Sequence, residues 1–110
     1  MGEPCIDLNR ELIRHPQATF LMRIRTVPSE GCGFSPGDVV LIDRATVASA
    51  GHLVVAVIDE EFVIRRLVRQ GQQLVLQVPG DPSRSATHRV DPSAIEIWGV
   101  ITHLIRSCMH

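Results

Sequence analysis

The stretch from residue 52 to residue 68 most constrains what this chain can fold into. Two strand-like runs, residues 52–58 and 62–68, lie on either side of an acidic turn at residues 59–61. Runs of this length, rich in Val and Ile and separated by a short polar turn, are typical of a β-hairpin. We therefore expect two antiparallel strands here, joined by a tight turn.

A third strand is expected earlier in the chain, over residues 18–27. Apolar and polar side chains alternate in this segment, which is the period of a half-buried strand. The expected inward side chains are Phe20, Met22 and Ile24, and the outward ones are Arg23 and Arg25.

Further strands are expected at regular spacing along the rest of the chain. Short ones cover residues 39–43, 72–78 and 87–90. The strand at 72–78 is expected to form a second hairpin with the strand at 62–68, across residues 69–71, and the strand at 87–90 is expected at a sheet edge. A long closing strand covers residues 95–105. Its expected inward side chains are Trp98, Val100 and Ile105.

The one helix expected from the sequence is short and N-terminal. Asp7 can cap a helix over residues 8–15, and Pro16 ends it. Short strands at regular spacing with so little helix predict a mainly β fold of short, mostly antiparallel strands. The length of 110 residues suits one domain, spanning residues 1–110.

Composition narrows the classes of function. Eleven basic and twelve acidic residues give a net charge of −1, which argues against a broad phosphate-binding surface and leaves a local basic patch around Arg65, Arg66 and Arg69. The three cysteines lack C-x-x-C spacing, so neither a disulfide framework nor a zinc site is expected. The longest apolar run, residues 53–58, is too short to span a bilayer, and a cytoplasmic protein is expected.

Three collinear stretches carry a resemblance to a known family. They are IDLNRELIRHPQATFLMRI (residues 6–24), GFSPGDVVLIDRATVASAGHLVVAVIDEEFVIRRL (33–67) and EIWGVITHLIR (96–106). Together they resemble the self-cleaving serine peptidase domain shared by LexA-type repressors and UmuD-type mutagenesis proteins, and the first stretch is closer to the UmuD type. The resemblance implies the mostly β domain of that family and a dimer.

The resemblance also implies where a catalytic dyad would lie. The family cleaves a peptide bond with a serine and a buried lysine, whose lowered pKa lets it accept the serine's proton. Aligned without gaps from the Gly37-Asp38 turn, the serine position falls on Pro28; with one deletion in EGCG it falls on Ser29. The lysine position falls on Arg65. A guanidinium cannot be deprotonated in a protein, so these are expected to be vestigial positions without catalytic residues.

Alternatives remain open for several of these side chains. Ser29 is either a nucleophile with an unusual base or a loop serine that stabilises a turn. Cys32 is either a replacement nucleophile, helped by the charge of Arg65, or a small residue in a Gly-rich loop. Arg65 and Arg66 either bind acidic groups or nucleic acid of a partner, or pair with the nearby acids Glu60 and Glu61.

No metal or cofactor is expected. The five histidines show no ligand spacing, and a site from His52, His88 or His103 would need long-range convergence. The glycines of the loop are not followed by the G-K-[ST] of a phosphate loop. The residues MGEPC before Ile6 lack a small-residue cleavage pair, so the chain resembles the processed, short form of the UmuD type.

The expected function follows from the resemblance and the lost dyad. It is a non-catalytic UmuD-like protein of the SOS response to DNA damage, serving as a dimeric accessory subunit of an error-prone translesion DNA polymerase. The expected partners are a second copy or a relative, and the polymerase catalytic subunit; neither a membrane nor direct sequence-specific DNA binding is expected. One alternative is an active serine peptidase that uses Ser29. The other is a decoy that heterodimerises with an active LexA- or UmuD-type relative. Which polymerase or relative is bound, and whether DNA damage controls expression, is left open by the sequence.

Overall fold

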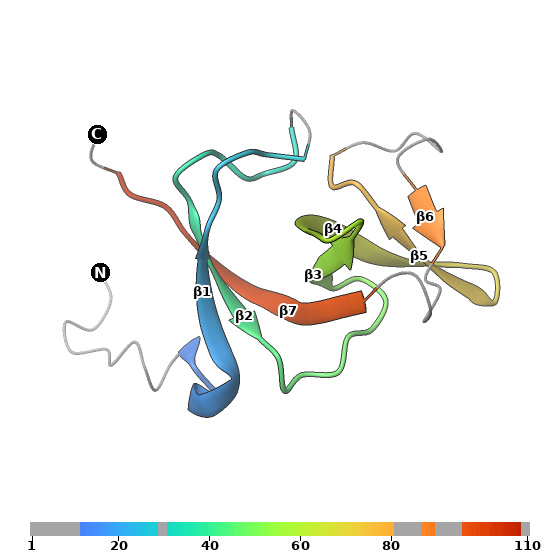
Figure 1. The fold of residues 1–110 in the computed structure, drawn as a ribbon, viewed down its shortest axis with the longest axis horizontal. Coiled ribbons are helices and arrows are strands. Elements are labelled where there is room, and N and C mark those ends of the chain that lie inside the picture. The colour runs from blue at the N-terminus through green and yellow to red at the C-terminus, as the bar shows by residue number, and fades with distance from the viewer. Residues whose placement is uncertain (1–11, 29–30, 81–86, 90–95, 109–110) are drawn as a thin grey trace, which may run out of the picture.

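One antiparallel sheet organises the molecule (Figure 1). The computed structural model describes residues 12–28, 31–80, 87–89 and 96–108. Its strands follow the spatial order β1-β2-β7-β3-β4-β5-β6, and every pair of neighbours is antiparallel. The elements are η1 (Pro16–Ala18), β1 (Thr19–Arg23), β2 (Val39–Asp43), β3 (Leu53–Ile58), β4 (Glu61–Gln70), β5 (Gln73–Gln77), β6 (Thr87–Arg89) and β7 (Glu96–Ile105). The mainly β fold predicted from the sequence is therefore confirmed.

The core is divided between the two faces of the sheet. Successive side chains of a strand point to opposite faces, and β3 contributes to both: Val55 packs in one cluster, Val54 and Ala56 in the other. This explains why β3 has no polar alternation, since a strand covered on both sides is apolar throughout. The first cluster contains Ile24, Val40, Ile42, Val55 and Ile64, and the second contains Val54, Ala56, Leu67, Leu76 and Val100.

Both predicted hairpins of the central region are confirmed, with one adjustment. The first turn has two residues, Asp59 and Glu60, because Glu61 already pairs with Ile58 as the first residue of β4. Both turn residues have positive φ, 51° and 67°, as in the type I′ turns that suit the twist of a two-residue hairpin. The second hairpin joins β4 to β5, and β6 pairs with β5 at the edge of the sheet, as predicted.

The closing strand β7 lies in the middle of the sheet, between β2 and β3 (Figure 1). Its pairing shifts register twice, between Leu41 and Ile42 of β2 and between Val55 and Ala56 of β3. Such bulges interrupt simple alternation. Val100 is buried as predicted, but the inward orientation expected for Ile105 is wrong, because its side chain is 47% exposed.

The N-terminal region departs further from the sequence prediction. β1 is shorter than the strand predicted over residues 18–27, although Ile24 just beyond it is buried. Phe20, predicted to point inward, is 43% exposed, because β1 lies at the edge of the described sheet and pairs there with β2 alone. Most of the predicted helix over residues 8–15 lies outside the described residues. Its expected extent to residue 15 is wrong, since residues 13–15 are not helical, and Pro16 begins a 3-10 turn instead.

No helix within the described ranges is long and apolar enough to cross a membrane.

Candidate functional site

A cleft of about 340 Å³ lies between the segment that leaves β1 and the first half of β4. One wall is formed by residues 22–28 and the other by residues 62–65. Pro28 and Arg65 both line it, so the structure brings together two of the three positions that the sequence singled out. Ser29, the third, lies outside the described residues.

The wall formed by β4 is an open strand edge. β4 pairs with β3 over residues 61–66 and with β5 over residues 66–70. On the side away from β3, residues 61–65 therefore have no strand beside them in the part of the chain that the structure describes. Unpaired strand edges expose backbone donors and acceptors that can pair with another chain.

The backbone groups on that edge belong to Phe62 and Ile64. Ile58 and Glu61 close a two-residue turn, and such a closing pair exchanges hydrogen bonds. Bonded residues alternate along an antiparallel pair, so residues 61, 63 and 65 bond to β3. The N–H and C=O groups of Phe62 and Ile64 consequently point toward the cleft side.

Arg65 is held in an unusual way at this edge. Its Nη1 donates a hydrogen bond of 2.8 Å to the backbone oxygen of the preceding residue, Ile64. Its Nε is fully buried and has no acceptor within the described part of the chain. Burial lowers the pKa of Arg65, but a guanidinium still remains protonated in a protein. A buried donor without a partner costs about 1–3 kcal/mol.

Basic residues are frequent along the walls of the cleft. Arg23, Arg25 and Arg65 all line it, and no Asp or Glu does among the described lining residues. Arg23 donates to the backbone oxygen of Gly37 at 3.1 Å and is otherwise exposed. Three arginines and several apolar residues are thus among the lining residues.

Neither Arg65 nor Arg66 forms an ion pair with Glu60 or Glu61 in the described structure. Arg66 is exposed and donates instead to the backbone oxygen of Gly51 at 2.8 Å. Because neighbouring residues of a strand point to opposite faces, Arg65 and Arg66 do not form one patch.

Cys32 lies away from Arg65. It lines a different cavity of about 230 Å³ with residues of β7, and it is absent from the lining of the Arg65 cleft. Its Sγ accepts the backbone N–H of Phe34 at 3.4 Å. These contacts suit a small residue that shapes a loop better than a nucleophile assisted by Arg65.

Asp38 and Arg106 form a clamp on the loop that precedes β2. Arg106 donates to both carboxylate oxygens of Asp38, through Nε at 2.9 Å and Nη2 at 2.8 Å. It also donates to the backbone oxygen of Gly33 at 3.0 Å, and Ser35 N–H donates to Asp38. The hydrogen bonds from Arg106 lower the pKa of the buried Asp38. Sequence reasoning missed this pair, because no local pattern connects residues that lie so far apart in the chain.

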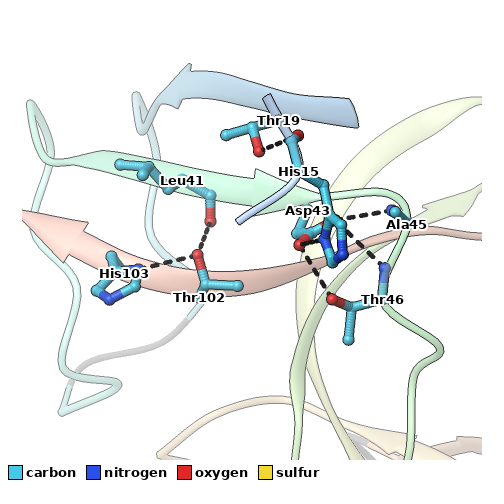
Figure 2. Close-up of polar contacts among 8 residues, drawn as sticks. All are labelled: His15, Thr19, Leu41, Asp43, Ala45, Thr46, Thr102 and His103. Carbon is cyan, nitrogen blue, oxygen red and sulfur yellow. Dashed lines mark hydrogen bonds and ion pairs between the residues drawn. The ribbon is translucent and has the colours of Figure 1, made fainter. Parts of the chain in front are cut away.

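A second buried carboxylate, Asp43, ties the segment before β1 to the end of β2 (Figure 2). His15 Nδ1 lies 2.6 Å from Asp43 Oδ2, and Thr46 Oγ1 donates at 3.0 Å. Burial acts to raise the pKa of Asp43, but the hydrogen bonds from His15, Ala45 and Thr46 outweigh it and lower the pKa. The polar atoms of this cluster hydrogen-bond to one another, and this arrangement suits a structural role.

The histidines that the structure describes do not converge on a metal site. In Figure 2, His103 contacts Thr102 of β7 and lies apart from His15 and Asp43. Within the described residues, no group of three His, Cys, Asp or Glu side chains is placed to hold a metal ion.

An aromatic cluster adjoins the cleft at Phe62. Trp98 of β7 packs between Phe20 and Phe62, with ring centroids 5.2 Å and 5.4 Å away. The guanidinium of Arg44 lies 4.4 Å from the centre of the Trp98 ring. Trp98, expected to point inward, is half-buried in this cluster, beside the exposed Phe20 and Phe62.

Comparisons with known proteins give a consistent result. A family model described as Peptidase S24-like matches residues 2–102. The chain is 34% identical over 100 residues to Protein MucA of Salmonella typhimurium, covering 89% of the chain and 66% of MucA. It is 34% identical over 104 residues to Protein ImpA of Salmonella typhimurium, covering 94% of the chain and 70% of ImpA. The LexA repressor of Pseudoalteromonas atlantica is 28% identical over 92 residues, covering 84% of the chain and 44% of the repressor. The chain thus spans about two thirds of the length of MucA.

Proposed function

The chain belongs to the Peptidase S24-like family of LexA- and UmuD-type proteins, and we propose that it serves there as a non-catalytic, dimeric accessory subunit of an error-prone translesion DNA polymerase. The polymerase role and the link to DNA damage are what the resemblance to the UmuD type implies. One observation supports the non-catalytic part: Arg65, which the resemblance aligns with the family's lysine, lines the cleft. Its guanidinium cannot accept the proton of a serine hydroxyl.

No lysine elsewhere in the sequence could replace the missing one. All eleven basic residues of the chain are arginines, so the 110 residues contain no lysine. The described lining of the cleft also holds no histidine or carboxylate that could act as a base. This supports the loss of the base, whichever of Pro28 and Ser29 stands at the nucleophile position.

The proposed dimer and its setting rest on surface properties. Leu104 and Ile105, at the end of β7, are 40% and 47% exposed and offer apolar surface to a second copy or a relative. The net charge of −1 gives no support to direct sequence-specific DNA binding. We place the protein in the cytoplasm, with no membrane partner.

Affinity capture from the organism's own DNA-damaged cells tests the proposal. The tagged protein is recovered, and the co-purifying proteins are identified by mass spectrometry, with undamaged cells and the tag alone as controls. A translesion polymerase subunit in the eluate supports the accessory role. Recovery of the protein alone contradicts that role.

The decoy alternative has its own outcome in the same experiment. It predicts a LexA- or UmuD-type relative in the eluate without any polymerase. Adding the purified protein to a self-cleaving relative then decides the matter, because a decoy slows the cleavage of that relative and an accessory subunit leaves it unchanged.

A further inference from the structure

The open edge of β4 carries backbone donors and acceptors to which another strand could bond. The backbone groups of Phe62 and Ile64 point away from β3, and β5 begins to pair only at Arg66. The segment 22–28 forms the opposite wall of the cleft. An extended peptide added at this edge would continue the ladder that β5 begins, as in other cases of strand addition.

The side chain of Arg65 already occupies one of the backbone acceptors that an added strand would use. Its Nη1 donates to the Ile64 oxygen, which is an acceptor of the open edge. A backbone N–H of an added strand can take over this acceptor and release the guanidinium. The released side chain can then present Nε and Nη2, the pair of donors that binds both oxygens of a carboxylate. The buried Nε, which has no acceptor among the described residues, would gain one.

We propose that this cleft binds an extended, acidic segment of a partner protein, which adds to the edge of β4 and places a carboxylate on Arg65. The charges favour this occupant, since three arginines and no described acidic residue line the cleft. A nucleic acid also carries negative charge, but it lacks the backbone amides that Phe62 and Ile64 require. The proposal adds to the proposed function the chemistry of a partner segment. It rests on the non-catalytic role, because the segment is bound and not cleaved.

A titration of the ¹⁵N-labelled protein with two blocked peptides tests the proposal. The probes are acetyl-Thr-Val-Glu-Val-Thr-amide and the same peptide with Gln in place of Glu. The Glu peptide is expected to shift the amide resonances of Phe62 and Ile64 and the Nε–H resonance of Arg65. Its affinity is expected to exceed that of the Gln peptide by about tenfold, the effect of a charge-assisted pair. A single-stranded oligonucleotide of equal charge is expected to leave the β4 amides unshifted.

Matched variants assign the preference to one side chain. Arg65→Gln is expected to bind both peptides alike, whereas Arg66→Gln, whose arginine bonds Gly51 outside the cleft, keeps the preference for Glu. Arg65→Lys retains a charge without the two-point geometry and is expected to keep only part of the preference. The comparison of the two peptides on the unaltered protein tests the proposal even if a variant does not fold.

The outcomes separate this proposal from the proposed function. Equal affinity for the two peptides, shifts located away from β4, or oligonucleotide binding at the β4 edge overturn the acidic peptide site. The mass of the recovered peptide, measured by mass spectrometry, tests the proposed non-catalytic role. A cleaved peptide contradicts the non-catalytic role while leaving the binding site in place.

Discussion

Arg106 binds both carboxylate oxygens of Asp38, at 2.9 Å and 2.8 Å, and so joins the end of β7 to the turn that begins β2. The carboxylate is buried, and the arginine is half-exposed on the surface. Since Arg106 also donates to the Gly33 oxygen, one side chain joins both ends of the segment 33–38 that leads into β2. Ile24 of the cleft wall bonds through its backbone to Gly37 and Asp38, so that wall is connected to the Asp38–Arg106 pair.

The first prediction concerns acid stability. The folded-state pKa of Asp38 is lowered, chiefly by the hydrogen bonds from Arg106. Its stabilising contribution is therefore present above the unfolded pKa of about 3.9 and is lost as the pH falls through the lower folded pKa. We expect the free energy of unfolding in urea to fall below about pH 4 and the fall to be shallower in Arg106→Gln.

Asp59→Asn serves as the control for this prediction, because Asp59 is an exposed turn residue and Asn also tolerates its positive φ. The control should keep the acid dependence of the unaltered protein. An Arg106→Gln variant with the same acid dependence as the unaltered protein would show that the pair contributes nothing to it.

The second prediction compares two glycines with positive φ. A Cβ at Gly80, at φ 80°, would lie 2.8 Å from backbone atoms of Gly31 and Cys32, whereas a Cβ at Gly71, at φ 61°, meets nothing within 4 Å. Gly71→Ala carries only the left-handed conformation and should cost about 1 kcal/mol. Gly80→Ala adds a clash with backbone and should cost roughly 2–4 kcal/mol. Urea unfolding of the two variants measures both values, and equal losses would refute the close approach at Gly80.

The third prediction concerns the stability cost of the cleft arginine. The Nε of Arg65 is buried without an acceptor among the described residues, so a side chain of similar length without this donor should be better tolerated. We expect Arg65→Met to raise the free energy of unfolding by about 1 kcal/mol. The exposed neighbour Arg66→Met should change it by less than about 0.5 kcal/mol. A loss of stability in Arg65→Met would mean that the arginine already has a compensating partner.

The fourth prediction is that Arg65→Lys alone does not create a peptidase. The substitution restores the family's base, but Pro28, which lines the cleft, has no nucleophilic side chain. Ser29 aligns with the nucleophile position only if one residue is deleted in EGCG. We expect the intact mass of the variant to stay constant over days at raised pH. Cleavage by this single variant would place Ser29 at the nucleophile position and would show that the gapped alignment is the right one.

Sequence patterns predicted the elements of the sheet better than their contacts. The hairpins were predictable because runs of β-branched residues and short polar turns act locally. The orientation of Ile105 was not, because the bulges in the pairing of β7 depend on partner strands. The exposure of Phe20 likewise follows from the edge position of β1, which alternation within the segment does not encode.

The candidate site was predictable in part. Arg65 was identified because the family resemblance places it at the lysine position, where a guanidinium cannot replace a neutral lysine. That Pro28 lines the same cleft, and that the first half of β4 has an open edge, depend on how segments far apart in the chain meet. The complete lack of lysine was present in the composition and is the simplest signal that the base is missing.

The most direct test of the central claim is an intact-mass time course of the purified protein at raised pH, alone and with a UmuD-type relative whose own nucleophile is replaced by alanine. Raised pH favours any base that must lose a proton before it acts. The account predicts that both chains keep their full mass, and that Ser29→Ala behaves like the unaltered protein. Fragments that accumulate with the unaltered protein and disappear in Ser29→Ala would contradict the account and identify an active peptidase.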